Sequence, residues 1–237
     1  MTQQLHETQL GILNKLLFAP NLRYKDLKLD DTVENNTFQF HLNKVIELGY
    51  VVKNNNTYSL TKEGKKYATH LDTDTNKIVE LRKVSVHLYC IRSTHNGDEC
   101  VIYTRKKHPF YGKQGFPAGK VRNGELFVDA AKREMKEETN LEGDPVLFNV
   151  THYLVKDKIT GELLDDKLFL DFFIKNPTGT LKSNNEGLFE WVPTENIEKY
   201  ILNPFDTIEI YQKSLKKIAS FKGTVSFDES EHLTSDF

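Results

Sequence analysis

Apolar residues recur every three or four positions in two stretches of the first fifty residues, which predicts two amphipathic helices. Pro20 ends the first helix, expected over residues 8–18, and Gly49 stands where a left-handed, helix-terminating residue belongs. Between the two helices, residues 23–27 predict a short helix, and the Asp-Asp-Thr segment at 30–32 offers capping side chains. The two apolar stripes are Leu10, Leu13, Leu16 and Leu17, and Phe38, Leu42, Val45 and Ile46.

A hairpin and a further helix are expected next. Residues 50–52 and 57–60 carry the β-branched and aromatic side chains of strands, and the asparagines between them tolerate the positive φ of a tight turn. Thr61 can cap a last helix that runs to about Leu71. Over residues 72–76 the chain turns polar and loses its periodicity, which indicates a linker.

After this linker, strands and helices alternate. Strands are expected at residues 84–90, 100–103, 146–154 and 167–174, and the last of them is apolar on both faces near its middle. Helices are expected from residue 123 onward, at 195–202 and at 207–220. This alternation predicts helices layered on a sheet, so the whole chain is assigned to the α+β class with two domains.

Composition limits the class of protein further. A chain of 237 residues with 38% hydrophobic residues is long enough for two domain cores. It has no apolar run of the roughly 18 residues that a membrane span needs and no signal-peptide pattern at its start, so we expect a cytoplasmic protein. A net charge of −2 provides no overall attraction to nucleic acid. Cys90 and Cys100 lie in apolar runs and are expected to be buried free thiols.

The first 75 residues resemble a winged helix-turn-helix domain. The stretch NTFQFHLNKVIELGYVVKNNNTYSLTKEGKKYA is similar to the recognition helix, wing and following segment of bacterial and archaeal transcriptional regulators. The resemblance implies that polar residues of the third helix enter the DNA major groove. Residues 1–76 hold nine basic and nine acidic side chains, so a protein-docking role is the alternative. The candidate base or phosphate readers are Asn35, Asn36, Gln39, His41, Asn43 and Lys44.

Negative charge is concentrated on the predicted helix after residue 123. Glu134, Glu137 and Glu138 stand at positions i, i+3 and i+4, so their carboxylates share one face and repel one another. A hard divalent cation would remove this repulsion, and Mg²⁺ prefers such oxygen ligands while it keeps waters that phosphate oxygens can replace. The alternative is a solvated face whose acids pair with Lys132 and Lys136.

The residues around these acids resemble the Nudix box, G-x5-E-x7-R-E-U-x-E-E-x-G-U, where U is aliphatic. The chain matches it from Gly119 through Glu125 and Arg133 to Leu141. Asn140 replaces the late glycine, and asparagine also adopts the left-handed conformation readily. The resemblance covers the chain from about residue 80 and implies a Nudix α/β/α sandwich with a mixed sheet over residues 80–237.

Membership of this family implies a diphosphate-cleaving metal site. Arg133 would pair with Glu125 and hold the carboxylates in position. One of the clustered glutamates would also be the base that activates the attacking water, and the sequence leaves open which one. Glu186, in a loop before a later strand, is the counterpart of a further glutamate that some members use, or else a turn residue. The implied ligands of Mg²⁺ or Mn²⁺ are Glu134, Glu137, Glu138 and the backbone carbonyl of Ala118.

The substrate is less clearly encoded than the metal site. ADP-ribose hydrolases of the family tend to carry a proline downstream of the box, and residues 146–157 contain none, which disfavours that subclass. Four aromatic residues are candidates for stacking on a base, with ordinary packing as the alternative. Three lysines are candidates for steering a polyphosphate toward the site, with simple solvation as the alternative. These residues are Tyr111, Phe116, Tyr153 and Phe169, and Lys106, Lys107 and Lys113.

Two functions follow from the two resemblances. The first is a Nudix pyrophosphohydrolase that acts on a nucleoside diphosphate derivative and carries the winged helix as an appendage. The second is a transcriptional regulator that binds DNA and senses a nucleotide metabolite through its Nudix domain. The complete set of acids favours the enzyme. The expected partners are a small nucleotide substrate, DNA in the regulator alternative, no membrane, and a second copy of the chain if it forms a homodimer.

Overall fold

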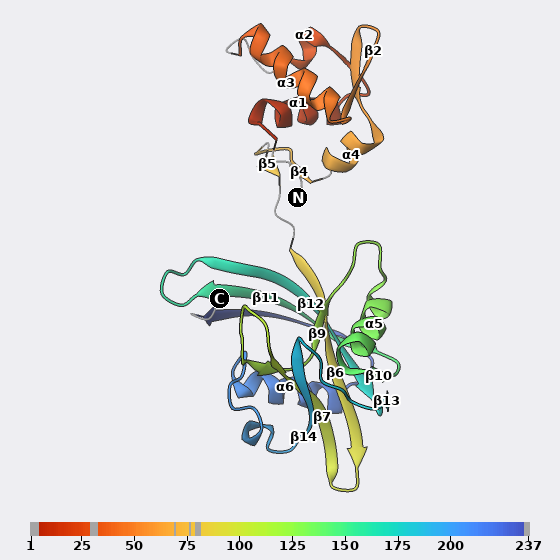
Figure 1. Cartoon of the computed structure of the whole chain (residues 1–237), viewed down its shortest axis with the longest axis vertical. Coiled ribbons are helices and arrows are strands. Elements are labelled where there is room, and N and C mark those ends of the chain that lie inside the picture. Colours follow the sequence, from red (N-terminus) through yellow and green to blue (C-terminus); the bar gives the residue numbers. More distant parts are fainter. Residues whose placement is uncertain (1–4, 29–32, 69, 76, 79–81, 235–237) are drawn as a thin grey trace. The chain divides into compact units, whose positions relative to one another are not determined.

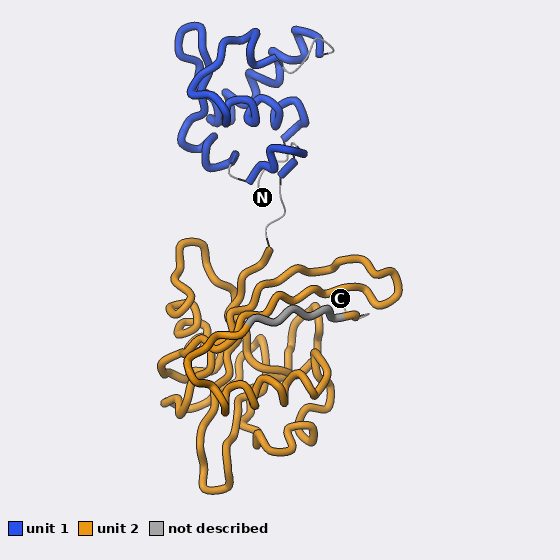
Figure 2. Tube along the Cα trace, turned by 180° about the vertical axis from the view of Figure 1, so that it is seen from behind, with its two compact units in different colours: residues 1–81 blue, residues 82–237 orange. Residues whose placement is uncertain are grey.

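The computed structural model describes residues 5–28, 33–68, 70–75, 77–78 and 82–234. The chain divides into two compact units, residues 1–81 and 82–237 (Figure 2). None of the helices in these described ranges is both long enough and apolar enough to cross a membrane.

Unit 1 contains the two amphipathic helices predicted from the apolar stripes. Leu13 of the first and Phe38 and Leu42 of the second are fully buried, and Tyr58 from the hairpin joins the same core. Three short strands pair in the order β1-β3-β2. The elements are α1 (Glu7–Leu17), β1 (Leu22–Arg23), α2 (Tyr24–Leu27), α3 (Asn35–Glu47), β2 (Val51–Asn54), β3 (Thr57–Leu60), α4 (Lys62–Ala68), β4 (Leu71–Asp72) and β5 (Lys77–Ile78) (Figure 1).

Three turn and cap predictions for unit 1, at Gly49, Asn55 and Thr61, are confirmed. Gly49, after α3, and Asn55, in the hairpin turn, have positive φ angles of +75° and +54°. Thr61 caps α4, because its hydroxyl oxygen accepts the backbone N–H of Gly64 at 2.9 Å. The capping role expected for residues 30–32 falls outside the described residues.

Three expectations for unit 1 are wrong. The last helix ends at Ala68, and Leu71 instead pairs with Ile78 in a two-stranded ladder, so part of the expected linker is β-structure. Leu17 is 37% exposed because α1 ends at this residue and its side chain lies outside the buried stripe. His41 is buried and stacks on His6 with ring centroids 4.2 Å apart, so it does not belong to the exposed face of α3.

Unit 2 is built on one mixed sheet with the strand order β14-β7-β6-β12-β11-β15. The β6–β12 and β11–β15 pairs are parallel and the other pairs along this order are antiparallel. Two short strands attach to this sheet, β8 to β7 and β9 to β6. The elements are β6 (Lys83–Thr94), β7 (Gly97–Arg105), β8 (Gln114–Gly115), β9 (Ala118–Lys120), α5 (Phe127–Thr139), β10 (Leu141–Glu142), β11 (Val146–Asp157), β12 (Leu163–Lys175), β13 (Thr178–Gly179), β14 (Gly187–Pro193), the 3₁₀ turn η1 (Ile197–Lys199), α6 (Ile208–Ala219) and β15 (Ser226–Thr234) (Figure 1).

The two helices of unit 2 cover opposite faces of the sheet. Leu88 of β6 is buried in one core together with Met135 of α5. Its neighbour Tyr89 is buried in a second core together with Tyr211 of α6. Since successive side chains of a strand point to opposite faces, α5 and α6 lie on either side of the sheet. The expected three-layer arrangement with a mixed sheet is therefore present in unit 2.

The largest differences from the sequence prediction concern the acidic helix, the helix expected at 195–202 and the strand β15. The acidic helix begins at Phe127 and not at residue 123, because Gly124 adopts φ +80° and the chain is still turning there. Of the helix expected at 195–202, only η1 forms, following Asn196 with φ +58°. β15 was not expected, since its sequence SFDESEHLT is mostly polar; it is held by its parallel pairing with β11.

The two cysteines should be inert in the native protein. Both are fully buried free thiols, and burial raises the pKa of each to about 12. Because the thiolate is the reactive form, we expect no alkylation of Cys90 or Cys100 by iodoacetamide at pH 8, and labelling of both after unfolding in guanidinium. Mass spectrometry of the intact protein checks this. Labelling of the native chain at the rate of the unfolded chain would contradict the buried positions.

Candidate active site

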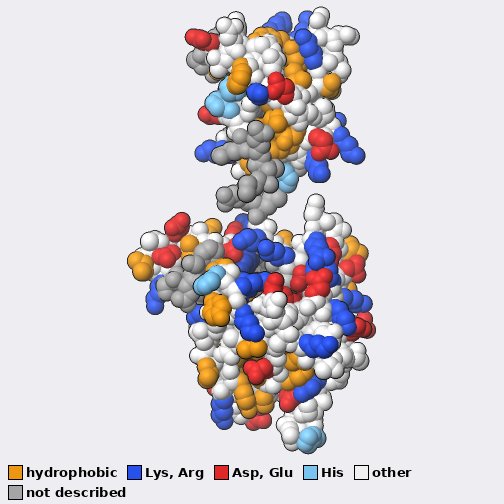
Figure 3. All heavy atoms as spheres, viewed as in Figure 1, with side chains coloured by type: hydrophobic (Ala, Val, Ile, Leu, Met, Phe, Trp, Pro, Cys, Tyr) orange, Lys and Arg blue, Asp and Glu red, His pale blue; other side chains and the backbone are white. Residues whose placement is uncertain are grey.

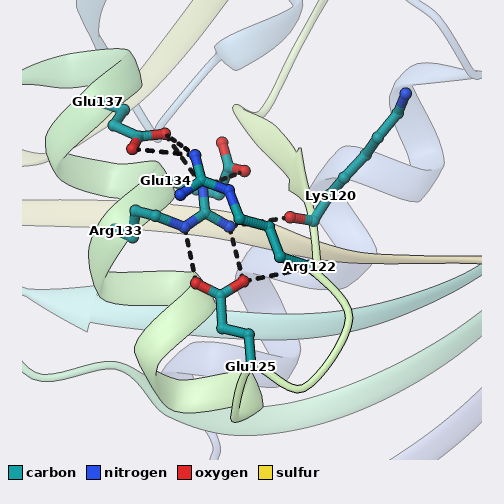
Figure 4. Close-up of polar contacts among 6 residues, drawn as sticks. All are labelled: Lys120, Arg122, Glu125, Arg133, Glu134 and Glu137. Atoms are coloured by element: carbon teal, nitrogen blue, oxygen red, sulfur yellow. Dashed lines mark hydrogen bonds and ion pairs between the residues drawn. The ribbon is translucent and has the colours of Figure 1, made fainter.

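Arg133 of α5 is the centre of an ion-pair cluster (Figure 4). Its Nε and Nη2 donate to the two carboxylate oxygens of Glu125 at 2.7 and 2.8 Å. Nη2 also donates to the backbone oxygen of Lys120 at 3.0 Å, and Nη1 donates to Glu134 at 2.6 Å and to Glu137 at 3.0 Å. Hydrogen bonds from Arg133 lower the pKa of Glu125 to about 2. The pairing of Arg133 with Glu125 expected from the sequence is thus present, and it fixes the loop before α5.

Glu134 lies in a space that only a glycine can leave open. It is 9% exposed, and its carboxylate lies directly over Gly119 of β9. A Cβ atom at residue 119 would stand 2.0 Å from Cδ of Glu134 and 2.1 Å from its Oε2, which is closer than atoms can approach. The glycine at the start of the box therefore has a direct steric reason here.

Glu137 faces two arginines. Besides its bond from Arg133, its two carboxylate oxygens accept hydrogen bonds from Nη2 of Arg122 at 3.2 and 3.3 Å. Arg122 also donates its backbone N–H to Glu125 at 2.9 Å. The alternative of a solvated face paired with lysines is wrong in detail. Lys132 and Lys136 pair with Asp144 and Glu142, away from the three clustered glutamates.

Glu138 occupies a partly buried position beside basic groups. Burial and, next, the negative charge of Glu134 raise the pKa of its carboxyl, and the charge of Lys107 works in the opposite direction. Asn184 donates its side-chain amide to the backbone oxygen of Glu138 at 3.1 Å. Lys107 forms an ion pair with Glu186, which joins the loop of Glu186 to this end of α5.

The oxygen donors of this cluster are of the chemical type that a hard divalent cation prefers. The carboxylates of Glu134 and Glu138 lie close enough that the charge of one perturbs the other, and Gly119 keeps the space beside Glu134 clear. Carboxylate and carbonyl oxygens are the ligands that Mg²⁺ prefers. Within the described ranges, no three His, Cys, Asp or Glu side chains are grouped so as to hold a metal ion, and Glu137 is engaged by arginines. A role in metal binding for Glu134, Glu137, Glu138 and Ala118 is therefore a proposal.

A cavity of about 950 Å³ connects this cluster with the sheet. One end is lined by Glu134, Glu138, Glu186 and the basic residues Arg105 and Lys107. Much of the rest is lined by alternate residues of three neighbouring strands, by the start of α6 and by loop residues such as Phe110, Phe116 and Phe205. The strand residues are Lys83, Ser85, His87 and Tyr89 of β6, Asp165, Lys167 and Phe169 of β12, and Asn149, Thr151 and Tyr153 of β11.

Three of the four aromatic candidates and one of the three lysines line this cavity. Phe116 is buried and packs on Tyr89 with ring centroids 4.2 Å apart. The hydroxyl of Tyr153 donates to Asp206 at 2.9 Å, and the Tyr153 ring meets Phe169 edge to face. Tyr111, Lys106 and Lys113 are not among the residues that line the cavity, so their stacking and steering roles stay untested expectations.

Figure 3 shows acidic and basic side chains adjoining one another on the visible face of unit 2. The resemblance to the Nudix box predicted the acidic side chains of this site. Of the basic residues Arg105 and Lys107 that line the cavity, only Lys107 was named from the sequence. Arg105 lies at the end of β7, and its position beside the acids follows from strand pairing that spacing along the chain does not reveal. Arg122 stands three residues before Glu125 and could have been noticed as a second arginine next to the box.

The fold, the cluster and the box lead to one assignment. The family model of the NUDIX domain matches residues 81–213, more than half of the chain. The chain belongs to the Nudix family. Among solved structures, the NUDIX domain of Shewanella oneidensis NrtR in complex with ADP ribose is 12% identical, with a TM-score of 0.51 over 67% of this chain and 99% of that one. The MutT protein from Bacillus halodurans is 17% identical, with a TM-score of 0.51 over 65% of this chain and 93% of that one. These likenesses show that unit 2 has the Nudix fold.

Asn140 completes the Nudix box in the conformation expected of it. It ends α5 in the left-handed region with φ +61°, and its side-chain amide donates to the oxygen of Thr180 at 2.9 Å. We expect Asn140→Ala to lower the free energy of unfolding by about 1–3 kcal/mol, since alanine disfavours this φ and lacks the bond. Asn140→Gly loses only the bond and should cost less.

Fluorescence of Trp191, the one tryptophan of the chain, follows the unfolding of unit 2 in urea. The ordering wild type, then Asn140→Gly, then Asn140→Ala is expected for the midpoints. Equal midpoints for the two variants would show that the backbone conformation at residue 140 is not what matters.

Proposed function

We propose that the chain is a divalent-metal-dependent pyrophosphohydrolase that cleaves a diphosphate linkage in a nucleoside diphosphate derivative. The observation that carries the proposal is the cluster of box residues on α5 and β9, in which Arg133 holds Glu125, Glu134 and Glu137 at one end of a large cavity. The Nudix family provides the reaction class. The cavity is large enough for a nucleotide-sized molecule.

The residues of the cluster have different roles in this proposed reaction. Glu134, Glu137, Glu138 and the carbonyl of Ala118 would hold Mg²⁺ or Mn²⁺, which when bound neutralises the phosphate oxygens and stabilises the leaving oxygen. Arg133 and Glu125 hold the acids in position. A glutamate of the cluster takes the proton of the attacking water. The water oxygen bonds to one phosphorus, and the bridging P–O bond breaks with its electron pair going to the leaving phosphate.

Glu186 is assigned a supporting role in the proposed reaction. It lines the cavity, and its ion pair with Lys107 places it at the acidic end. Burial and, next, the charge of Arg105 lower the pKa of Lys107, and the charges of Glu138 and Glu134 act in the opposite direction, so Lys107 also interacts with these two glutamates. We assign Glu186 to ligand or base duty in this reaction, with Lys107 and Arg105 neutralising the diphosphate.

The test is a substrate panel with and without metal. The full chain is incubated with ADP-ribose, a nucleoside diphosphate sugar, a dinucleoside polyphosphate and nucleoside triphosphates, in Mg²⁺, in Mn²⁺ and in excess chelator. We expect release of a nucleoside monophosphate from at least one compound, its loss in chelator and its return on addition of excess metal. If no compound is cleaved with either metal, the hydrolase proposal is wrong.

A regulator is the second candidate. Unit 1 has the order of helices and hairpin on which the resemblance to winged helix-turn-helix domains rests, and we propose domain limits of 1–75 and 80–237. Asn35, Asn36 and Asn43 of α3 are exposed, while Gln39 donates to Asn43 at 2.8 Å and Lys44 pairs with Glu47 at 2.7 Å. These internal pairs would have to open for DNA contact.

A DNA-binding assay separates the two roles of unit 1. The full chain is titrated onto a duplex taken from upstream of its own gene, at about 50 and 200 mM salt, because contacts to phosphates weaken steeply over this range. Affinity that falls with salt would support the regulator. Absence of such binding would favour a protein-docking role for unit 1.

A further inference from the structure

A row of polar side chains crosses the sheet of unit 2 and ends next to β9, the strand that contains Gly119 of the Nudix box. In the strand registers, Asn149 of β11 stands opposite Asp171 of β12, Asp171 stands opposite His87 of β6, and His87 stands opposite Ala118 of β9. Polar residues are unusual inside such strands; Asp171 interrupts the apolar run KLFLDFFIK. The row ends beside Ala118, the carbonyl proposed as a metal ligand.

Asp171 is a buried carboxylate with one oxygen left for His87. It is 1% exposed. Its Oδ2 accepts hydrogen bonds from the side-chain amide of Asn149 and the hydroxyl of Thr151, both at 2.7 Å. No described residue makes a well-formed hydrogen bond to its Oδ1, and Nδ1 of His87 lies 3.3 Å away. Burial of a carboxylate costs free energy unless both of its oxygens are paired, so the incompletely paired Oδ1 of Asp171 points to a functional role.

The imidazole of His87 is held between aromatic rings. The ring of Phe169 lies 5.0 Å from it at 32°, and the ring of Tyr89 lies 5.0 Å from it at 57°. The hydroxyl of Tyr89 is 3.4 Å from Nδ1, and burial raises the pKa of that phenol so that it stays protonated. His87 lines the cavity, and its Nε2 makes no hydrogen bond to any residue that the structure describes.

An ionised carboxylate only accepts hydrogen bonds. Nδ1 of His87 is therefore assigned the proton that faces Oδ1 of Asp171, which leaves Nε2 of the neutral ring as an acceptor. We propose that Asp171 orients His87 so that Nε2 accepts a hydrogen bond from a hydroxyl or amino group of the bound nucleoside, which makes His87 a specificity-determining residue. The inference rests on the proposed nucleotide substrate and adds which chemical group of it is recognised.

The recognised group is a donor located close to the diphosphate. His87 stands opposite Ala118, and the next residue of β9 is Gly119, against which the Glu134 carboxylate packs. A ribose hydroxyl meets both requirements. A base amine is a donor but lies further from the diphosphate, and the inosine analogue tests it separately. A site that hydrogen-bonds a ligand donor rejects an analogue without it, because the site's own polar group is then left unpaired.

The test measures binding with single-donor analogues. The probes are adenosine diphosphate, its 2′-deoxy and 3′-deoxy forms, and inosine diphosphate, titrated by calorimetry in Mg²⁺ into the full chain carrying Glu138→Gln, so that turnover does not consume them. We expect one analogue to bind at least about tenfold more weakly than adenosine diphosphate. His87→Phe keeps a ring between Phe169 and Tyr89, and should bring all four affinities within about threefold.

Two further variants separate orientation from simple packing. In Asp171→Asn, Asn149 and Thr151 still donate hydrogen bonds, and these fix the amide oxygen of the new asparagine on their side. Its NH₂ group then faces Nδ1 of His87. Because this NH₂ group is a donor, Nδ1 must accept, and the histidine proton moves to Nε2. The preference should disappear although His87 is still present. His152 is the matched control. Its Nε2 pairs with Asp166 at 3.0 Å outside the cavity wall, and His152→Phe should leave the preference unchanged.

The outcomes distinguish this inference from the proposed reaction. A preference that His87→Phe and Asp171→Asn remove supports the inference, even if the wild type cleaves none of the panel compounds. Equal binding of all four probes to the parent chain, an unchanged preference in His87→Phe, or no binding of any probe would overturn it. Thermal melting of each variant shows whether the fold is retained. If His87→Phe does not fold, His87→Leu takes its place, because leucine also lacks a hydrogen-bond acceptor and should remove the preference in the same way.

Discussion

Replacing Glu138 by glutamine is expected to lower the rate of nucleoside monophosphate release at least about a hundredfold. The carboxyl is partly buried beside Glu134, and it lines the acidic end of the cavity. Glutamine keeps the shape but removes the charge and the ability to accept a proton, and loss of a positioned base or charged group costs on this order. Initial rates are measured at saturating substrate over a Mg²⁺ titration, on the compound that the wild type cleaves best.

Glu142→Gln is the matched control for this prediction. Glu142 lies four residues further along the chain, on β10, where it pairs with Lys136 at 2.7 Å and does not line the cavity. Its removal should leave the rate within about twofold, since exposed ion pairs contribute little. If Glu138→Gln cleaves as fast as Glu142→Gln, Glu138 has no part in the reaction.

Gly119→Ala should damage the site through Glu134. The added methyl group would stand 2.0 Å from Cδ of Glu134, so the carboxylate or the strand β9 must move. A displacement of about 1 Å at a catalytic group can cost on the order of a hundredfold in rate. Overpacking also costs about 1–3 kcal/mol of stability. We expect a hundredfold lower rate, together with a lower unfolding midpoint measured through Trp191.

A double-mutant cycle shows whether the effect passes through Glu134. In Glu134→Ala, the three side-chain atoms nearest the new methyl group are absent. Adding Gly119→Ala to this background should therefore change the residual rate and the midpoint far less than it does in the wild type. Equal effects in both backgrounds would mean that Gly119 acts on the backbone of β9 and not on the glutamate.

The helices of this protein were the most predictable part of its fold. α1, α3 and α6 follow from apolar side chains at helical spacing, which is a local property of the sequence. The start of α5 was placed four residues too early because Asn123 and Gly124 were expected to begin the helix, whereas Gly124 adopts φ +80° and the chain is still turning there. β15 was missed because it forms only by pairing with the distant β11.

The candidate site was predictable only where it lies in one short segment. Glu134, Glu137, Glu138 and Arg133 could be named from their spacing, and Gly119 from the box. On the opposite wall, Tyr153 and Phe169 were candidates by residue type alone and His87 was not named, since the three meet only through the registers of three strands. His41 shows the same limit in unit 1: it was assigned to the exposed side of its helix, and its partner His6 belongs to a different segment.

The alternation along β6 gives the two faces of one strand different roles. Val86, Leu88 and Cys90 pack toward α5, whereas His87 and its odd-numbered neighbours face the cavity. Substitutions at the odd positions can therefore retune which metabolite is accepted while the packing under the acidic helix stays intact. Insertion of one residue would exchange the two sets and destroy both properties together. Divergence among relatives of this chain should accordingly proceed by point replacement along β6, with length changes confined to its flanking turns.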